Sequence, residues 1–280
     1  MIATTQRPGQ RDARIGAAPQ SPTAEPAEVQ SSASKALAVL EVLGRSAGAT
    51  VGVTEVAAEI GVPKSTAHRL LKTLEQHGFV GRSGTRYRVG GSLFELAQAA
   101  AWSEFGELRE AAPAPLSWLF ERSDAIAVHL AVLSGPSVLY LEKVTRPEGT
   151  RLPSRVGGRF PATCTALGKA ILSRSTPAEV QRVLHGPMTR ATPYSVVMRR
   201  QFVEQLRQAA ARGYAIEREE SCQGTLCVAA PVVRDGRAIA AVSMCVPTLG
   251  LGRAAEQRLG SFGRLTVEAA DRVRALLPST

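Results

Sequence analysis

The chain has 280 residues, 44% of them hydrophobic, and carries a formal net charge of +10. At roughly 100–200 residues per domain this length predicts two domains, and the positive charge favours a polyanionic partner such as DNA or RNA. The sequence has no apolar run of about 18 residues, which argues against a transmembrane helix, and no apolar signal core near its start. We therefore expect a cytoplasmic protein.

The first ordered element is predicted to begin near Ser31. Residues 1–30 are dominated by Pro, Ala, Gln, Ser, Thr and charge, a composition that buries too little apolar surface to offset the entropy of ordering, so we expect a disordered tail. From Ser31 the apolar residues recur at helical spacing. They are Ala36, Leu37, Val39, Leu40 and Leu43.

The next segment has the pattern of a helix-turn-helix. One helix is predicted from an N-cap at Thr54 to Gly61, and a second from about Pro63 to a C-cap glycine at Gly78. Ala57 is small enough for a close helix crossing, and Gly61 tolerates the positive φ of the turn. The apolar residues expected to hold the two helices together are Val56, Ile60, Val62, Ala67 and Leu70. Any pair of helices joined by a glycine meets some of these requirements. The exposed face of the second helix therefore has to distinguish a DNA-binding motif from an ordinary helix pair.

That exposed face is polar and basic. Its residues are Lys64, Ser65, Thr66, His68, Arg69 and Lys72. Such side chains bind phosphates or the edges of bases, and we expect Lys64 and Arg69 to make the main contacts.

A basic hairpin is predicted directly after this helix. Strands over 79–82 and 86–89 flank a turn at 83–85, and residues 61–88 hold six Lys or Arg against one acid. A charge run is usually a solvated face, but here it flanks the predicted reading helix. We therefore predict a winged helix-turn-helix DNA-binding domain over residues 31–90. Its wing contributes Arg82, and Arg86 and Arg88 as phosphate contacts.

The remaining residues predict a linker helix and a larger domain. The linker is expected over 91–108 and the domain over 109–280, with an α+β fold in which helices flank an antiparallel sheet. The expected helices are 109–122, 165–174, 177–184, 199–212 and 254–277, and the expected strands are 125–132, 137–144, 225–233 and 238–246.

At this point the sequence resembles the IclR family of bacterial transcriptional regulators over about residues 31–277. The resemblance rests on Ser34–Leu37, Val62–Leu71, Ala166–Ala170, Gly213–Glu220, and Gly224 with Cys227–Val232. It implies a GAF-like effector domain, a homodimer or homotetramer, and a double-stranded DNA operator whose affinity a small-molecule effector controls. Two positions depart from the family pattern: Glu217 stands where Asp or Ser is usual, and Val233-Arg234 replaces an aromatic and acidic pair.

An effector pocket is expected around the start of the helix near Thr165. Helix N-termini present free N–H groups that suit a carboxylate, and Ala166 and Leu167 match family effector positions. The resemblance implies that the pocket is also lined by Phe160, Glu217, Thr225, Cys227, Ser243 and Cys245. Residues 225/227 and 243/245 alternate along strands and so share one sheet face, although small residues there are also common in cores. We expect a small organic or aromatic acid as effector.

Other classes of protein fit less well. No catalytic motif is present, His129 on a strand is better explained by packing or pocket lining than by catalysis, and we expect neither an enzyme nor a cofactor. A DNA-compacting protein without a ligand would not need the larger domain.

A metal- or redox-responsive regulator stays open as the alternative, because thiolates bind zinc or oxidise reversibly. Its candidate residues are Cys164, Cys222, Cys227 and Cys245. Their spacing is not that of a metal knuckle, and we expect no structural disulfide among them.

Overall fold

The computed structural model describes residues 31–46, 48–146, 152–186, 188–248 and 252–278. The predicted tail, residues 1–30, lies outside this part. The chain divides into two compact units, one ending at Phe94 and the other beginning at Glu95. In the described part no helix is long and apolar enough to cross a membrane.

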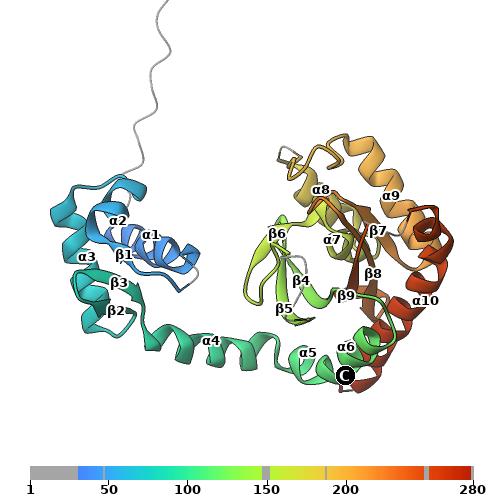
Figure 1. Cartoon of the computed structure of the whole chain (residues 1–280), viewed down its shortest axis with the longest axis horizontal. Coiled ribbons are helices and arrows are strands. Elements are labelled where there is room, and N and C mark those ends of the chain that lie inside the picture. The colour runs from blue at the N-terminus through green and yellow to red at the C-terminus, as the bar shows by residue number, and fades with distance from the viewer. Residues whose placement is uncertain (1–30, 47, 147–151, 187, 249–251, 279–280) are drawn as a thin grey trace, which may run out of the picture. The chain divides into compact units, whose positions relative to one another are not determined.

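The N-terminal unit contains three helices packed on a small antiparallel sheet of order β1-β3-β2 (Figure 1). Its elements are α1 (Ser32–Arg45), β1 (Val51–Gly52), α2 (Val53–Glu59), α3 (Lys64–Gln76), β2 (Val80–Ser83) and β3 (Arg86–Val89). The helices bury Val39, Val56 and Leu71, and the sheet adds Val80 and Tyr87 to the same core. This is the winged helix-turn-helix arrangement that the sequence predicts.

The turn between α2 and α3 has the predicted geometry. Ala57 and Ala67 are buried where the two helices meet, and Gly61 has a φ of +67°. The N–H of Val62 donates to the carbonyl of Ala57 at 3.0 Å and closes the turn. The two alanines allow the close approach, and the glycine supplies the left-handed backbone, because a Cβ in that region is strained.

The predicted start of α2 is wrong. The helix begins at Val53 with Gly52 as its N-cap residue, and Thr54 is exposed on the first turn. The cause is a strand that the sequence did not reveal: Val51 and Gly52 pair with Tyr87 and Arg86 of β3. The chain therefore passes directly from the sheet into the helix. At the end of α3, Gly78 follows the C-cap residue His77 and has a φ of +75°, as expected of a glycine that ends a helix.

Helix α4 (Gly91–Glu104) spans the division between the units. The C-terminal unit then contains α5 (Gly106–Ala111), α6 (Pro113–Glu121), β4 (Ala127–Ser134), β5 (Ser137–Thr145), β6 (Arg159–Pro161), the 3-10 turn η1 (Ala162–Cys164), α7 (Ala166–Leu172), α8 (Pro177–Leu184), α9 (Arg199–Arg212), β7 (Ala215–Arg218), β8 (Thr225–Arg234), β9 (Arg237–Pro247) and α10 (Gly252–Leu276). The predicted single helix over 109–122 is two helices, because Pro113 lacks an N–H and begins a new one.

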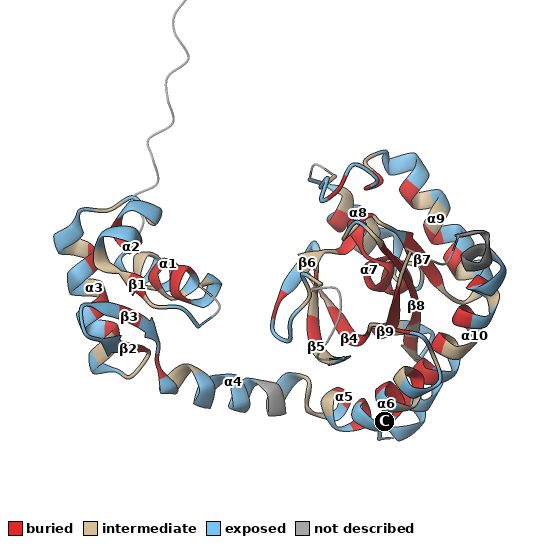
Figure 2. Cartoon of the chain, viewed as in Figure 1, coloured by how far each residue is buried: buried red, intermediate tan, exposed pale blue. Residues whose placement is uncertain are grey.

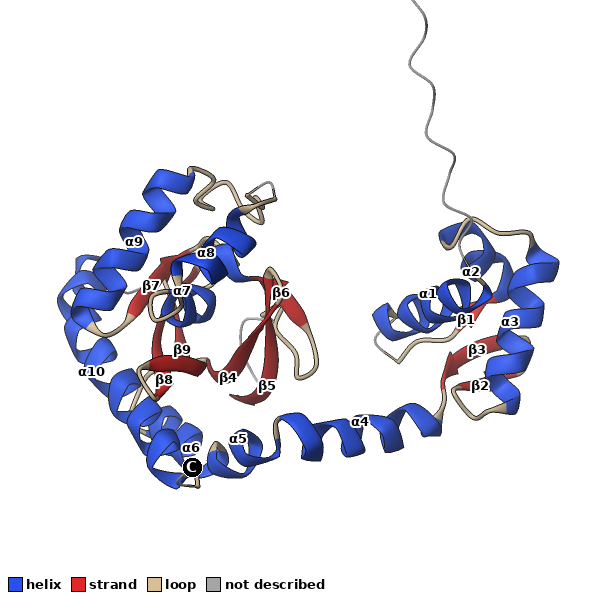
Figure 3. Cartoon of the chain, turned by 180° about the vertical axis from the view of Figure 1, so that it is seen from behind, coloured by secondary structure: helices blue, strands red, loops and turns tan. Residues whose placement is uncertain are grey.

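The strands of this unit form one antiparallel sheet of order β6-β5-β4-β9-β8-β7. Helices α6 and α10 cover one face and α7 the other, with α9 beyond α7 (Figures 1 and 3). Alternation along β9 sends Val242 and Met244 into the core beneath α10, and Ala241 and Cys245 towards α7. The central strands β4, β9 and β8 are buried over most of their length (Figure 2). The predicted α+β class is confirmed; β6 and β7, which the sequence did not predict, complete the sheet edges.

Candidate functional sites

The outer face of α3 carries the polar residues that the sequence assigned to DNA reading. Lys64, His68, Arg69 and Lys72 are exposed, while Ala67 and Leu71 on the opposite face are fully buried. Of the other two assigned residues, Ser65 is exposed and Thr66 is half-buried. No ion pair within the described part of the chain involves Lys64, Arg69 or Lys72. Their charges are therefore available to a polyanion.

The wing arginines differ in their partners. Arg86 donates to the Glu55 carboxylate at 3.0 and 3.1 Å and to the Thr50 carbonyl at 2.7 Å. The Arg86 guanidinium also lowers the pKa of Glu55. Arg82 donates to the Gly84 carbonyl, and within the described residues Arg88 makes only a long 3.4 Å hydrogen bond, to the Val89 carbonyl. Arg86 thus ties the wing to α2, whereas Arg88 is much freer to bind a phosphate.

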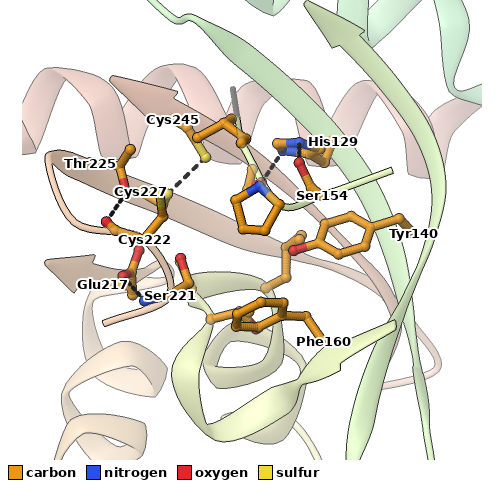
Figure 4. A pocket seen from close by; sticks show the side chains of 16 residues that line it. His129, Tyr140, Ser154, Phe160, Glu217, Ser221, Cys222, Thr225, Cys227 and Cys245 are labelled. Atoms are coloured by element: carbon orange, nitrogen blue, oxygen red, sulfur yellow. Dashed lines mark hydrogen bonds between the residues drawn. The ribbon is translucent and has the colours of Figure 1, made fainter. Parts of the chain in front are cut away.

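A recess lies between the α7 face of the sheet and the start of α7 (Figure 4). The room inside it for the centre of a water-sized sphere is about 30 Å³, so the recess is narrow in this conformation. All eight residues expected to line an effector pocket line this recess: Phe160, Ala166, Leu167, Glu217, Thr225, Cys227, Ser243 and Cys245. Eight further residues line it, of which the sequence analysis considered only His129 for such a role: His129, Tyr140, Leu152, Pro153, Ser154, Thr165, Ser221 and Cys222. Of these, Tyr140 could have been predicted from the sequence, because it lies on the strand expected over 137–144.

Helix α7 is capped and closely packed at one wall of the recess. Thr165 caps it by accepting a hydrogen bond from the Gly168 N–H at 3.0 Å. A Cβ on Gly168 would lie 2.1 Å from the Ala162 carbonyl oxygen, so only glycine allows η1 to pack this closely on the helix. The first-turn N–H groups of Ala166 and Leu167 have no partner within the helix, as in any helix. They lie on residues that line the recess.

Behind the recess, a buried ion pair joins α7 to the loop after β7. Lys169 is 1% exposed and bonds to the carboxylate of Glu220, which is also buried. Burial lowers the pKa of Lys169, and the charge of Glu220 opposes that change. The Glu220 carbonyl also accepts a hydrogen bond from Ser195 at 2.7 Å. These contacts fix the loop that carries Ser221 and Cys222.

A polar network forms the end of the recess at β4. The two ring nitrogens of His129 lie 2.9 Å from Ser154 Oγ and 3.3 Å from Ser243 Oγ. The His129 ring also packs at 5.3 Å from that of Tyr140. Lys143 donates to the Ser154 carbonyl at 2.8 Å. His129 is therefore a pocket-lining side chain whose nitrogens are both engaged, as the sequence analysis favoured over catalysis.

Glu217, on β7, has an incompletely satisfied carboxylate. The Ser221 N–H donates to its Oε1 at 2.6 Å, but its Oε2 is buried without a hydrogen-bond partner. Burial raises the pKa of Glu217 to about 7, and the Ser221 hydrogen bond opposes this shift. In Figure 4, Glu217 and Ser221 lie across the recess from the rings of Tyr140 and Phe160. The recess thus has aromatic walls and one buried polar atom that calls for a partner.

The four cysteines do not converge on a metal site. In the described part of the chain, no group of three or more His, Cys, Asp or Glu is arranged to hold a metal ion. Cys164 donates to the Thr189 carbonyl, away from the others. Only Cys227 and Cys245 have their sulfur atoms close together. The arrangement gives no support to metal sensing by the four thiols.

A winged helix-turn-helix in one unit and a polar and aromatic recess in the other are the features of a ligand-responsive DNA-binding protein, and comparisons with known proteins identify the same class. The IclR helix-turn-helix domain model matches residues 32–84, and the model of the bacterial transcriptional regulator IclR C-terminal domain matches residues 104–274. The chain belongs to the IclR family of bacterial transcriptional regulators. This confirms the resemblance found in the sequence.

Individual relatives support the same class. The chain is 33% identical to the regulator XynR of Escherichia coli over 78% of this chain and 86% of that protein. It is 30% identical to the transcriptional repressor IclR of E. coli over 93% and 95% of the two chains. Among solved structures, an IclR homologue of Microbacterium hydrocarbonoxydans complexed with 4-hydroxybenzoate has a TM-score of 0.76 and 25% identity, over 88% of this chain and 99% of that one. The protein is therefore a DNA-binding regulator with a C-terminal effector-binding domain, in a family of regulators rather than enzymes.

Proposed function

We propose that the protein binds its operator through the outer face of α3, and that a small organic acid bound in the recess changes its operator affinity. An aromatic acid is the first candidate. The observation that carries the proposal is the recess itself, which combines aromatic walls, helix N–H groups and the unpartnered Oε2 of Glu217. The cytoplasm is the compartment where such a protein meets DNA.

DNA recognition is assigned to exposed groups of α3 and the wing. Arg69 and Lys64 are placed for base edges or phosphates, and Arg88 for phosphate. Arg86 contributes by holding the wing, and reaches a phosphate only in competition with Glu55. The full set proposed for the interface is Lys64, Ser65, Thr66, His68, Arg69, Lys72, Arg82, Arg86 and Arg88.

The effector is proposed to span the recess from α7 to Glu217. Its carboxylate accepts hydrogen bonds from the Ala166 and Leu167 N–H groups, and a hydroxyl at its other end donates to Glu217 Oε2. The ring between them packs beside Tyr140 and Phe160. The ligand of the structural relative, 4-hydroxybenzoate, has a carboxylate and a hydroxyl at opposite ends, which makes it a suitable first probe. The remaining lining residues, Thr225, Cys227, Ser243 and Cys245, complete the site.

A homodimer is proposed as the minimal DNA-binding form, with a tetramer as the larger alternative. One winged domain contacts few base pairs, and a two-fold pair doubles the contacts. Exposed apolar side chains on α1 and α4 would be covered by a second copy: Leu37 on α1, and Phe94 and Leu96 on α4. Sedimentation or light scattering of the wild type beside Phe94→Glu tests this; an unchanged mass in the variant contradicts a dimer through α4.

The proposed control is a shift between two states of different operator affinity. An effector shifts such an equilibrium only by its difference in affinity for the two states. We propose that closure around Phe160 and Thr225 is coupled through α4 to the spacing of two recognition helices. An effector that binds equally well to operator-bound and free protein contradicts this scheme.

The decisive experiment is binding of the purified protein to DNA from its own upstream region, titrated with salt and with unrelated competitor DNA. Selective binding at physiological salt, released by 4-hydroxybenzoate or another small organic acid, supports the proposal. Unselective binding that vanishes with salt reflects only the net positive charge.

A variant tests the pocket. Ala166→Trp fills the recess and should block the effector response while leaving operator binding intact. An unchanged response removes Ala166 from the pocket.

A further inference from the structure

Two of the four cysteines face each other inside the recess. Cys227 on β8 and Cys245 on β9 are directly opposite in the antiparallel register, and their sulfur atoms are 2.7 Å apart (Figure 4). Opposite residues on antiparallel strands have Cα atoms about 4.5–5.5 Å apart, which lies within the range that a disulfide spans. Both residues line the recess, so a small solute that enters it meets both sulfur atoms.

The other two thiols are placed differently. Cys164 is buried with its Sγ donating to the Thr189 carbonyl at 3.3 Å, and Cys222 is half-exposed on the loop after β7. Cys222 lines the recess, and its Sγ donates to the carbonyl of Gln223 at 3.6 Å. The geometry therefore selects one pair among the four cysteines.

The environment makes the two facing thiols unequal. A hydrogen bond from Cys227 lowers the pKa of Cys245 against the opposing effect of burial, and the neighbouring His129 ring and Lys143 ammonium also lower it. The same hydrogen bond and burial raise the pKa of Cys227. Thiolates, not thiols, are the nucleophiles in oxidation chemistry. Cys245 is thus the attacking thiolate of the pair, and Cys227 is the resolving thiol beside it.

We propose that Cys227 and Cys245 form a reversible dithiol–disulfide couple, a modification site for hydroperoxides within the effector recess. The Cys245 thiolate attacks a peroxide oxygen; the O–O bond breaks, a sulfenic acid forms on Cys245, and the other oxygen leaves as water or an alcohol after protonation. The Cys227 sulfur then attacks the sulfenic sulfur, the S–O bond breaks, and water leaves with the Cys227 proton. The two thiols supply the two electrons that reduce the peroxide.

This site goes beyond the proposed function and does not depend on it. Oxidation replaces the Cys245 thiolate and the Cys227 thiol by a neutral disulfide in the wall of the recess. Any ligand that contacts this wall meets a different surface in the two redox states. The effector-sensing unit therefore contains its own means of responding to peroxide.

The test is mass spectrometry of the full-length protein, reduced, treated with hydrogen peroxide and then alkylated. After trypsin, Cys227 lies in residues 219–234 together with Cys222, and Cys245 lies in residues 238–253. We expect these two peptides to be cross-linked, two hydrogens lighter than their sum, and separated again by dithiothreitol. The matched control Cys222→Ser should retain the cross-link, which assigns it to Cys227.

Single variants test the order of attack. Cys227→Ser should stop at a sulfenic acid on Cys245, trapped by dimedone, whereas Cys245→Ser should leave Cys227 alkylated as a free thiol. The proposal is overturned if wild-type protein stays fully alkylated after peroxide, if Cys222→Ser loses the cross-link, or if Cys245→Ser is oxidised as fast as the wild type. Each readout is a mass, so the result is independent of any operator or effector.

Discussion

The outer face of α3 and the recess beneath α7 use polar side chains in opposite ways. On α3 the charges are exposed and free of ion pairs in the described structure, as at Lys64 and Arg69. In the recess His129 is buried with both ring nitrogens hydrogen-bonded, and Glu217 Oε2 is buried without a partner. Exposed charge attracts a polyanion over distance, whereas buried polar groups select a small ligand by the hydrogen bonds they still need.

The largest effect on stability is expected when the buried Lys169–Glu220 ion pair is broken. Lys169→Met leaves the Glu220 carboxylate buried without its partner, which should destabilise the C-terminal unit by about 3–5 kcal/mol. Denaturant unfolding of the full chain measures the loss. The double variant Lys169→Met with Glu220→Met removes both charges and should recover most of it. A single variant as stable as the wild type would show that the pair is not held in the buried state.

The next effect is a dependence of stability on pH. Burial raises the pKa of Glu217 from 4.5 to about 7, so the folded protein binds the proton more tightly than the unfolded chain. Stability therefore falls as pH rises through this window, by about 3 kcal/mol at most. Glu217→Gln removes the titration, and its advantage over the wild type should grow between pH 5 and pH 8. Parallel stability curves for the two proteins over that range would contradict the raised pKa.

A smaller effect, on DNA rather than stability, is expected at the exposed site. Arg69→Ala should weaken operator binding by about 1–3 kcal/mol, roughly 5- to 150-fold, because it removes a free cation from the reading face. Arg45→Ala is the matched control: it removes the same charge from the same unit, but Arg45 is paired with Glu59 at 2.8 Å. Fluorescence anisotropy with a labelled operator measures both. Equal affinities of Arg69→Ala and the wild type remove Arg69 from the site.

The smallest effect separates the two wing arginines. Arg88→Ala should reduce the slope of log affinity against log salt by about one, because a phosphate contact is lost. Arg86→Ala should change that slope less, since Arg86 is engaged with Glu55 and Thr50. Salt titrations of the two variants show which arginine contacts a phosphate and which one holds the wing in place. If Arg86→Ala has the larger change, the Glu55 ion pair opens when DNA binds.

Much of the DNA-reading unit could be predicted from the sequence because its signals are local. Helical periodicity, Gly61 and the basic residues of 64–88 lie within one short segment, and each acts on its neighbours in the chain. The two-residue strand β1 was not predictable, because it exists only through pairing with β3. That pairing also moved the start of α2 from Thr54 to Val53.

The recess could be predicted only in part. Strand alternation and the family resemblance identified eight lining residues on separate segments, and the structure brings all eight together. Ser154, Ser221 and Cys222 were not predicted, because they lie on irregular loops that have no periodicity to read. Strand β7 was also missed: it is four residues long, and its place at the sheet edge depends on pairing with β8.

Periodicity, composition and spacing, which act along the chain, predicted the two units, the helix-turn-helix and the α+β fold. The resemblance of particular motifs to the IclR family added the family and the effector-binding role. Only the tertiary structure decided which groups are free and which are engaged: that Arg86 is tied to Glu55, that Lys169 is paired with Glu220, and that Cys227 faces Cys245. The physical reason is that partners 18 to 51 residues apart meet through packing and strand register, which no local pattern encodes.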